Sequence, residues 1–159
     1  MSGPDINDVL ALVDYDASTG VFLSKKSQGR MVKGAPAGAL RSDGYRVISV
    51  RGKSYRAHRL AWLISYGKWP ALIDHINRDR DDNRIANLRE ATKPENMANS
   101  VLRDGKPITG TRWAAHAKRW MARTTIAGKT VFLGYFDTQE KAAAAYRSKR
   151  RELFPEFAP

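Results

Sequence analysis

The 159-residue sequence contains no cysteine. This absence excludes disulfide bonds, and it excludes zinc fingers and ribbons that depend on thiolate ligands. A metal site in this chain must therefore use His, Asp, Glu, Asn and water. Such ligands suit Mg²⁺ or Mn²⁺ better than structural zinc.

Long hydrophobic runs are missing as well. No segment approaches the roughly 18 apolar residues that a membrane-spanning helix needs. The N-terminal segment MSGPDINDVL lacks the basic and apolar regions of a secretory signal. We therefore expect a soluble, cytoplasmic protein without membrane contact. Hydrophobic residues make up 42% of the chain, which is enough for packed cores in one ordinary domain or two small ones.

Acidic side chains are few relative to basic ones, and the net charge is +12. There are 16 Lys and Arg against 11 Asp and Glu up to residue 100, and 12 against 5 beyond it. Lys and Arg displace counterions from phosphates, so the charge predicts a polyanionic partner such as double-stranded DNA, held most strongly by the C-terminal part. A basic protein without a nucleic-acid partner is the alternative that charge alone leaves open.

Short strands are predicted over residues 9–56, because VFLSKK, YRVISV and KSYRAH are rich in β-branched and aromatic residues and are separated by Gly-containing turns. Arg51-Gly52-Lys53 reads as a hairpin turn. The segment HRLAWLISYGKWP then changes to helical spacing, and Gly67 and Pro70 follow in the usual order for a helix end. We expect this helix to pack by one face on the N-terminal sheet.

Residues 70–102 predict a strand, a loop, a second strand and a helix. ALID is short and apolar, NRDRDDNR is a polar loop, and IANLRE can form the second strand. Thr92-Lys93-Pro94-Glu95 has the form of a capping box with Pro early in the first turn, so a helix should begin after Thr92. On that register Asn96 lies in the first exposed turn.

The polar residues of this stretch could hydrolyse a phosphodiester with the help of a metal ion. His75 can act as general base, because imidazole is largely neutral at pH 7. Asp74 and His75 are neighbours on a strand and point to opposite faces, so Asp74 could bind a metal while His75 serves a water. Asn96 offers a neutral oxygen for the same metal, and Asn87 could fix the loop or the imidazole by hydrogen bonds. Taken singly, each of these residues is more often structural.

This stretch resembles a known family. HRLAW, IDHIN, DDNRIANLR and ATKPEN, in this order, are similar to the phage-type HNH endonucleases, which include free-standing and intron-encoded homing enzymes. The resemblance implies a ββα-metal fold with Asp74 and Asn96 as metal ligands, His75 as general base and Asn87 as the central asparagine. The motif reads His, Asn, Asn, a variant of the homing-type branch. His58 matches a recurrent family position.

The roles of three further polar residues stay open at this point. For His58 we favour a structural role or a place near the DNA over a role as the base. Asn83 and Asn99 are weaker alternatives to Asn87 and Asn96.

The C-terminal part predicts a second unit after a polar linker at residues 103–109. GTRWAA, KRWMARTTI and TVFLGYF are strand-like, and a helix should run from Asp137-Thr138 through AAAAYRSKRREL. These segments resemble the AP2 DNA-binding domain, in which a three-stranded sheet enters the major groove with a helix packed behind it. Strand alternation and this resemblance together predict DNA contacts from five residues, namely Arg112, Arg119, Arg123, Thr125 and, less firmly, Lys129.

Taken together, the sequence predicts an α+β protein of two modules. They are an HNH endonuclease domain at residues 1–102, with its ββα core at about 70–102, and an AP2-like domain at 110–159. The expected activity is Mg²⁺- or Mn²⁺-dependent hydrolysis of DNA, and the resemblance to the HNH endonucleases implies 5′-phosphate and 3′-hydroxyl ends. One such site nicks one strand, so a monomer is plausible, and a double-strand break needs a second nick or a dimer. A non-catalytic DNA-binding regulator and an RNA-binding protein are the competing hypotheses.

Overall fold

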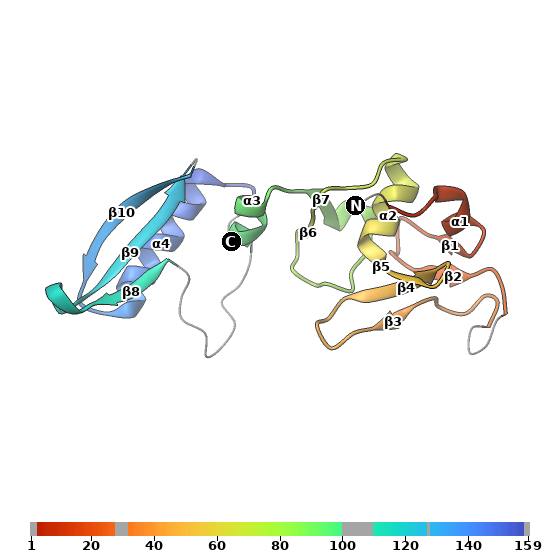
Figure 1. Cartoon of the computed structure of the whole chain (residues 1–159), viewed down its shortest axis with the longest axis horizontal. Helices are drawn as coiled ribbons and strands as arrows, with labels where there is room; N and C mark the ends of the chain where they lie inside the picture. The colour runs from red at the N-terminus through yellow and green to blue at the C-terminus, as the bar shows by residue number, and fades with distance from the viewer. Residues whose placement is uncertain (1–2, 28–31, 100–109, 127, 158–159) are drawn as a thin grey trace. The chain divides into compact units, whose positions relative to one another are not determined.

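The computed structural model describes residues 3–27, 32–99, 110–126 and 128–157. Over these residues the chain is mixed α and β, with four helices and several small antiparallel sheets (Figure 1). It divides into two compact units, Met1–Lys93 and Pro94–Pro159. No helix in the described part of the chain is both long and apolar enough to cross a bilayer. The linker predicted at 103–109 lies outside the described residues.

The first unit is built from short strands around one central helix. Its elements in order are α1 (Ile6–Leu10), β1 (Val13–Tyr15), β2 (Phe22–Ser24), β3 (Ala39–Leu40), β4 (Arg46–Val50), β5 (Lys53–Arg56), α2 (Ala57–Tyr66), β6 (Ile73–His75), the 3-10 helix η1 (Ile85–Asn87) and β7 (Leu88–Glu90). The strands form three antiparallel sheets, which are β1-β2, β3-β4-β5 and β6-β7.

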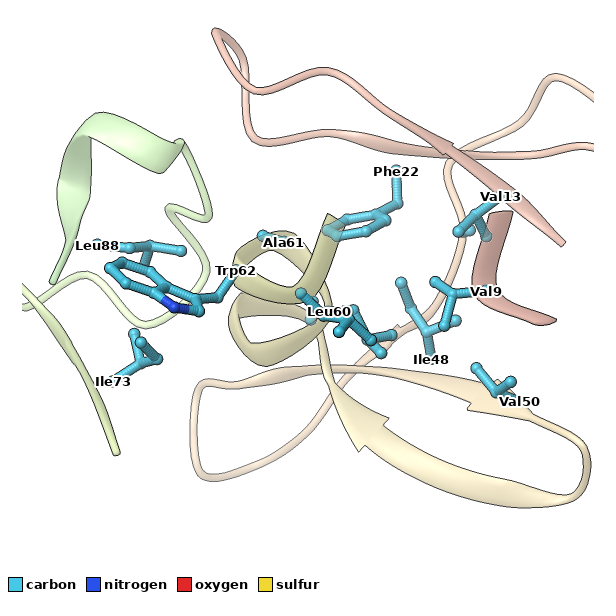
Figure 2. Close-up of a cluster of buried hydrophobic side chains, with 13 residues drawn as sticks. Val9, Val13, Phe22, Ile48, Val50, Leu60, Ala61, Trp62, Ile73 and Leu88 are labelled. Atoms are coloured by element: carbon cyan, nitrogen blue, oxygen red, sulfur yellow. The ribbon is translucent and has the colours of Figure 1, made fainter. Parts of the chain in front are cut away.

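Helix α2 lies at the centre of the core because its apolar residues recur at helical spacing. Leu60 and Ala61 are fully buried in the cluster that also holds residues of α1, β1, β2 and β4. Trp62 lies close to Ile73 of β6 and Leu88 of β7 (Figure 2). The helix therefore supports the β6-β7 hairpin from one side and the N-terminal sheets from the other.

The helix predicted to end at Gly67 is confirmed. Gly67 adopts the left-handed conformation with φ 68°, and its N–H donates to Leu63. The helix begins at Ala57, so the strand predicted from KSYRAH ends at Arg56. His58 consequently lies in the first turn of α2.

Two local predictions were wrong. Residues 9 and 10, expected in strand structure, belong to α1, whose N-cap Asp5 accepts a hydrogen bond from the N–H of Asn7. The first half of IANLRE is the 3-10 helix η1 and only its second half is strand β7. The reason is the side chain of Asn87, which bonds to the backbone of the preceding loop and so fixes a turn there.

The β1-β2 hairpin supports the loop that follows β6. The hydroxyl of Tyr15 donates to the carbonyl of Asn83 at 2.8 Å, and the N–H of Ile85 donates to Ala17 at 3.1 Å. Gly20 has φ 76°, and a Cβ atom built on it would lie 2.4 Å from the backbone nitrogen of Arg84. The close approach of these two backbones requires glycine at this position.

We expect Gly20→Ala to lower the melting temperature by at least about 10 °C, because it adds a clash with Arg84 to the cost of a left-handed alanine, roughly 1–2 kcal/mol. Gly52→Ala is the matched control. Gly52 has φ 75° and nothing within 4 Å of its built Cβ, so this variant carries the conformational cost alone. Thermal unfolding followed by circular dichroism compares the two. Equal decreases in melting temperature for the two variants would show that the close approach of Gly20 to Arg84 contributes nothing to stability.

Helix α3 (Lys93–Asn99) starts directly after Thr92, as the capping box predicts, and all of it but Lys93 belongs to the second unit. The remaining elements are β8 (Thr111–Ala114), the 3-10 helix η2 (Ala115–Ala117), β9 (Arg119–Ile126), β10 (Lys129–Phe136) and α4 (Gln139–Leu153). The three strands form an antiparallel sheet in the order β10-β9-β8. Helix α4 packs on this sheet, and its Ala142 and Ala143 are fully buried.

The helix predicted near Asp137-Thr138 is confirmed, with Thr138 as N-cap accepting from the N–H of Lys141 at 3.3 Å. Arg150 near its other end is buried, donates to the carbonyl of Pro94 and lies over the ring of Phe154. These contacts tie α3 to α4 within the second unit.

Candidate active site

Strand β6 places two chemically distinct side chains at adjacent positions. Its pairing with β7 sets Asp74 opposite Arg89 and His75 opposite Leu88. Asp74 and His75 are 5% and 4% exposed. Since neighbours on a strand point to opposite faces, the carboxylate and the imidazole have different surroundings.

Asp74 lies against Arg89. The Nε and Nη2 atoms of Arg89 contact Oδ2 of Asp74 at 3.0 and 2.8 Å. A buried carboxylate needs such a partner, because removing an unpaired charge from water is costly. A carboxylate has lone pairs for both a guanidinium and a cation, so this ion pair is compatible with a metal-binding role.

His75 lies in an aromatic cluster. Its ring centroid is 4.9 Å from that of His58, edge to face, and 5.9 Å from that of Tyr45. Burial lowers the pKa of His75, and the opposing effects of Asn83 and the nearby carboxylates are smaller. The imidazole is therefore neutral at pH 7 and able to accept a proton.

The two loop asparagines have different contacts. Asn87 Oδ1 accepts from the N–H of Asn77 at 3.0 Å, and its Nδ2 donates to the carbonyl of Asp82 at 2.8 Å. Asn83 is 2% exposed, and its Nδ2 donates to the carbonyl of Asp81 at 2.8 Å. Both asparagines thus bond to the backbone of the loop that follows β6.

The loop between β6 and η1 is further fixed by ion pairs. Arg46 contacts both carboxylate oxygens of Asp81 at 2.9 and 2.8 Å. Asp82 accepts hydrogen bonds from Arg84 and Asn77, and those from Arg84 make the largest contribution in lowering its pKa to about 2. These contacts restrain the loop that follows His75.

His58 is buried beside His75, and its predicted role, structural or near the DNA, stays a prediction. Burial lowers its pKa to about 3, with a further contribution from the charge of His75. Tyr45 contacts both histidine rings. Sequence reasoning did not find Tyr45, because it is far from the motif and contacts the histidines only when the turn before β4 packs near α2.

The depressed pKa of His58 predicts acid-sensitive folding. The folded state binds this proton only near pH 3, whereas the unfolded chain binds it near pH 6.5, so stability is complete above about pH 6.5 and falls as the pH is lowered. Between about pH 7 and about pH 4.5, we expect the melting temperature of His58→Gln to fall by less than that of the native protein. His116→Gln, at an exposed histidine, should follow the native curve. A parallel decline of native protein and His58→Gln would contradict this assignment.

The other predicted metal ligand, Asn96, lies half-buried in α3 of the second unit, whereas Asp74 belongs to the first. Its alternative, Asn99, is buried in the same helix. Within the described residues, no three His, Asp or Glu side chains gather to hold a metal ion. A Mg²⁺ site does not require such a cluster, because this ion keeps several waters and often takes one or two carboxylates together with substrate phosphate.

The predicted DNA-binding residues all lie on the surface of the second unit. Arg112, Arg119, Arg123, Thr125 and Lys129 are exposed, whereas Ala122 and Thr124 are buried. The register pairs Arg112 with Met121 and Lys129 with Ile126. Strand alternation therefore puts Arg112, Arg119, Arg123 and Thr125 on one face of the sheet. Lys129 lies at the β9-β10 turn.

Comparisons with known proteins address the first unit most directly. Residues 55–98 match the family model of the HNH endonucleases. The chain is 34% identical over 122 residues to a protein of Acanthamoeba polyphaga mimivirus named "Uncharacterized HNH endonuclease L560", and the match covers 75% of this chain and 63% of that protein. No solved structure gives a significant match to the chain. Residues 55–98 are therefore similar to the HNH endonucleases, and the chain spans less than two thirds of the length of the viral protein that it matches.

Proposed function

We propose that the protein is a metal-dependent DNA endonuclease that nicks one strand, with His75 as the general base. The observation that carries this proposal is the buried, neutral imidazole of His75 at the end of β6, next to the carboxylate of Asp74 on the other face of the strand. The HNH similarity of residues 55–98 covers both residues.

His75 would take the proton of the attacking water, and the surrounding side chains hold its ring. His58 and Tyr45 pack against the ring, and Asn87 fixes the loop that follows. Together they prevent rotation of the imidazole away from the substrate. Removing water from around the ring also keeps it in the basic form at pH 7.

Asp74 and Asn96 are the residues that we propose as ligands of Mg²⁺ or Mn²⁺. Carboxylate and amide oxygens are hard donors that these ions prefer. A bound divalent ion would supply positive charge at the phosphate and the leaving oxygen. Hydrolysis would leave 5′-phosphate and 3′-hydroxyl ends.

The second unit is proposed as an AP2-like anchor on double-stranded DNA. Its support is the sheet of three strands with α4 packed on it, and the exposed basic residues on β8 and β9. Arginine side chains on a strand can reach both phosphates and base edges in the major groove. A homing-type enzyme combines such an anchor with a nicking domain.

The metal assignment is tested with Asn96→Ala. We expect native protein to nick supercoiled plasmid in Mg²⁺ or Mn²⁺ and not in EDTA. Asn96→Ala should need at least about tenfold more metal for half-maximal nicking, since losing a ligand or its support typically costs 10–100-fold in affinity. Its DNA binding should be nearly unchanged.

The matched control is Asn7→Ala, at an exposed helical asparagine of the first unit. It should behave as the native protein in both assays. Equal loss of binding and nicking in Asn96→Ala would mean that Asn96 supports the fold instead. Binding that survives chelation without any nicking by the native protein would favour the non-catalytic regulator.

A further inference from the structure

Two arginines lie against Tyr45, the residue that contacts both buried histidines. The Cζ atom of Arg56 is 3.9 Å from the centre of the Tyr45 ring, and that of Arg80 is 5.0 Å from it. Arg56 is the last residue of β5, Tyr45 lies in the turn before β4, and Arg80 lies in the loop after β6. We refer to Arg56 and Arg80 as the Tyr45 arginine pair.

The positive charge of the Tyr45 arginine pair is only weakly compensated. Arg80 donates from Nη1 to the main-chain carbonyl of Asp43 at 2.7 Å, and no carboxylate of a described residue lies within ion-pair distance of it. Arg56 approaches the Asp43 carboxylate at 3.4 Å, where the two side chains are 47% and 41% exposed. An ion pair so exposed contributes little and is readily exchanged for another anion.

Arg46, the residue after Tyr45 in the chain, provides the contrast. Its guanidinium makes two short contacts with Asp81 and is thereby neutralised. It serves to fix the loop. Among the described residues, the Tyr45 arginine pair has only the long, exposed contact of Arg56 with Asp43, although both of its side chains lie against the ring.

The geometry suits a phosphate ligand. A guanidinium presents a planar fork of N–H donors that matches phosphate oxygens, and stacking on a ring leaves those edges available. Because the ring and the Asp43 carbonyl already restrain the side chains, little conformational freedom is lost when an anion binds. The ring that holds the pair also packs on His75, so an anion bound there lies beside the general base.

We propose that Arg56 and Arg80 bind the backbone phosphates of the DNA strand whose scissile bond is presented to His75. This inference rests on the proposed function and names a second set of DNA contacts, in the first unit. These contacts position the strand at the site, separately from the sheet of the second unit.

The test uses the full-length double variant Arg56→Gln/Arg80→Gln. Each lost phosphate contact lowers the slope of log Kobs against log salt by about 0.9, so we expect a decrease of about 1.8 for a short DNA duplex of arbitrary sequence. Plasmid nicking in Mg²⁺ should show an apparent KM raised at least about tenfold. The double variant Arg56→Lys/Arg80→Lys, which keeps both charges, should restore most of the slope.

Arg51→Gln is the matched control, because Arg51 is exposed in the turn at the far end of β4 and its ion pair is with Asp8. It should leave the slope and the KM unchanged. Thermal melting of every variant confirms the fold, and the Lys variant decides the matter if the Gln variant does not fold.

Two outcomes would overturn the inference. One is a double Gln variant that folds and keeps the native slope and KM. The other is a Lys variant that folds and binds as weakly as the Gln variant, since the loss would then not follow the charge. Absence of nicking by the native protein would contradict the proposed function, and the salt slopes would still decide the role of the arginines.

Discussion

His75→Ala should reduce the rate of DNA nicking by about 10²- to 10⁴-fold, the usual contribution of a general base. DNA binding should stay within about twofold of the native value, because the imidazole is buried and the proposed anchoring residues lie elsewhere. The rate is measured under single-turnover conditions with saturating protein, so that a change in affinity cannot imitate a change in chemistry.

His116→Ala is the control for this experiment. His116 is an exposed histidine of the second unit, and its Nε2 lies 2.9 Å from the hydroxyl of Tyr135. We expect native rates from it. His75→Gln retains more of the packing against His58 and Tyr45 than alanine does, and it should be equally slow. A His75→Gln variant that folds and nicks at the native rate would remove His75 from the mechanism.

Replacing the three sheet arginines together should have the largest effect on binding. Arg112, Arg119 and Arg123 are exposed on one face of the β8-β9 pair. If each contacts one phosphate, the triple Gln variant lowers the salt slope by about 2.7 and weakens binding by two to three orders of magnitude at about 0.1 M salt. Fluorescence anisotropy on one labelled duplex over a salt series measures both quantities.

A second triple variant removes the same charge from the other side of this unit. Lys141, Arg147 and Arg151 are exposed on α4, which packs on the sheet by its opposite face. Their replacement by Gln should leave the slope nearly unchanged, because the change in net charge is then not located at the interface. Equal slopes for the two triple variants would contradict the assignment of the sheet as the DNA-binding face.

Local sequence pattern predicted the elements whose stability is decided locally. The apolar spacing of α2 and the glycine after it mark that helix, and Thr138 marks the start of α4. The 3-10 turn at Ile85–Asn87 was not predictable in this way, because it depends on the bonds of the Asn87 side chain to a loop several residues upstream.

In the candidate site too, local features could be predicted from the sequence, whereas contacts between distant segments could not. The Asp74-His75 pair could be predicted as a unit from its place at the end of a strand, and the structure sets the two side chains in the different surroundings expected there. The packing of Tyr45 and His58 on His75 could not be predicted, since it joins segments that are distant in sequence. Asn83 and Asn87 have similar sequence contexts, and only the structure shows which loop groups each of them bonds to.

The central claim is that the end of β6 is a hydrolytic site. Its most direct test is nicking of supercoiled plasmid by native protein and by His75→Ala, each in Mg²⁺ and in EDTA, with binding to the same DNA measured in parallel. The account predicts nicks only for the native protein in Mg²⁺, and similar binding in all four samples. Bound but intact DNA in every sample, over several unrelated DNAs, would contradict it.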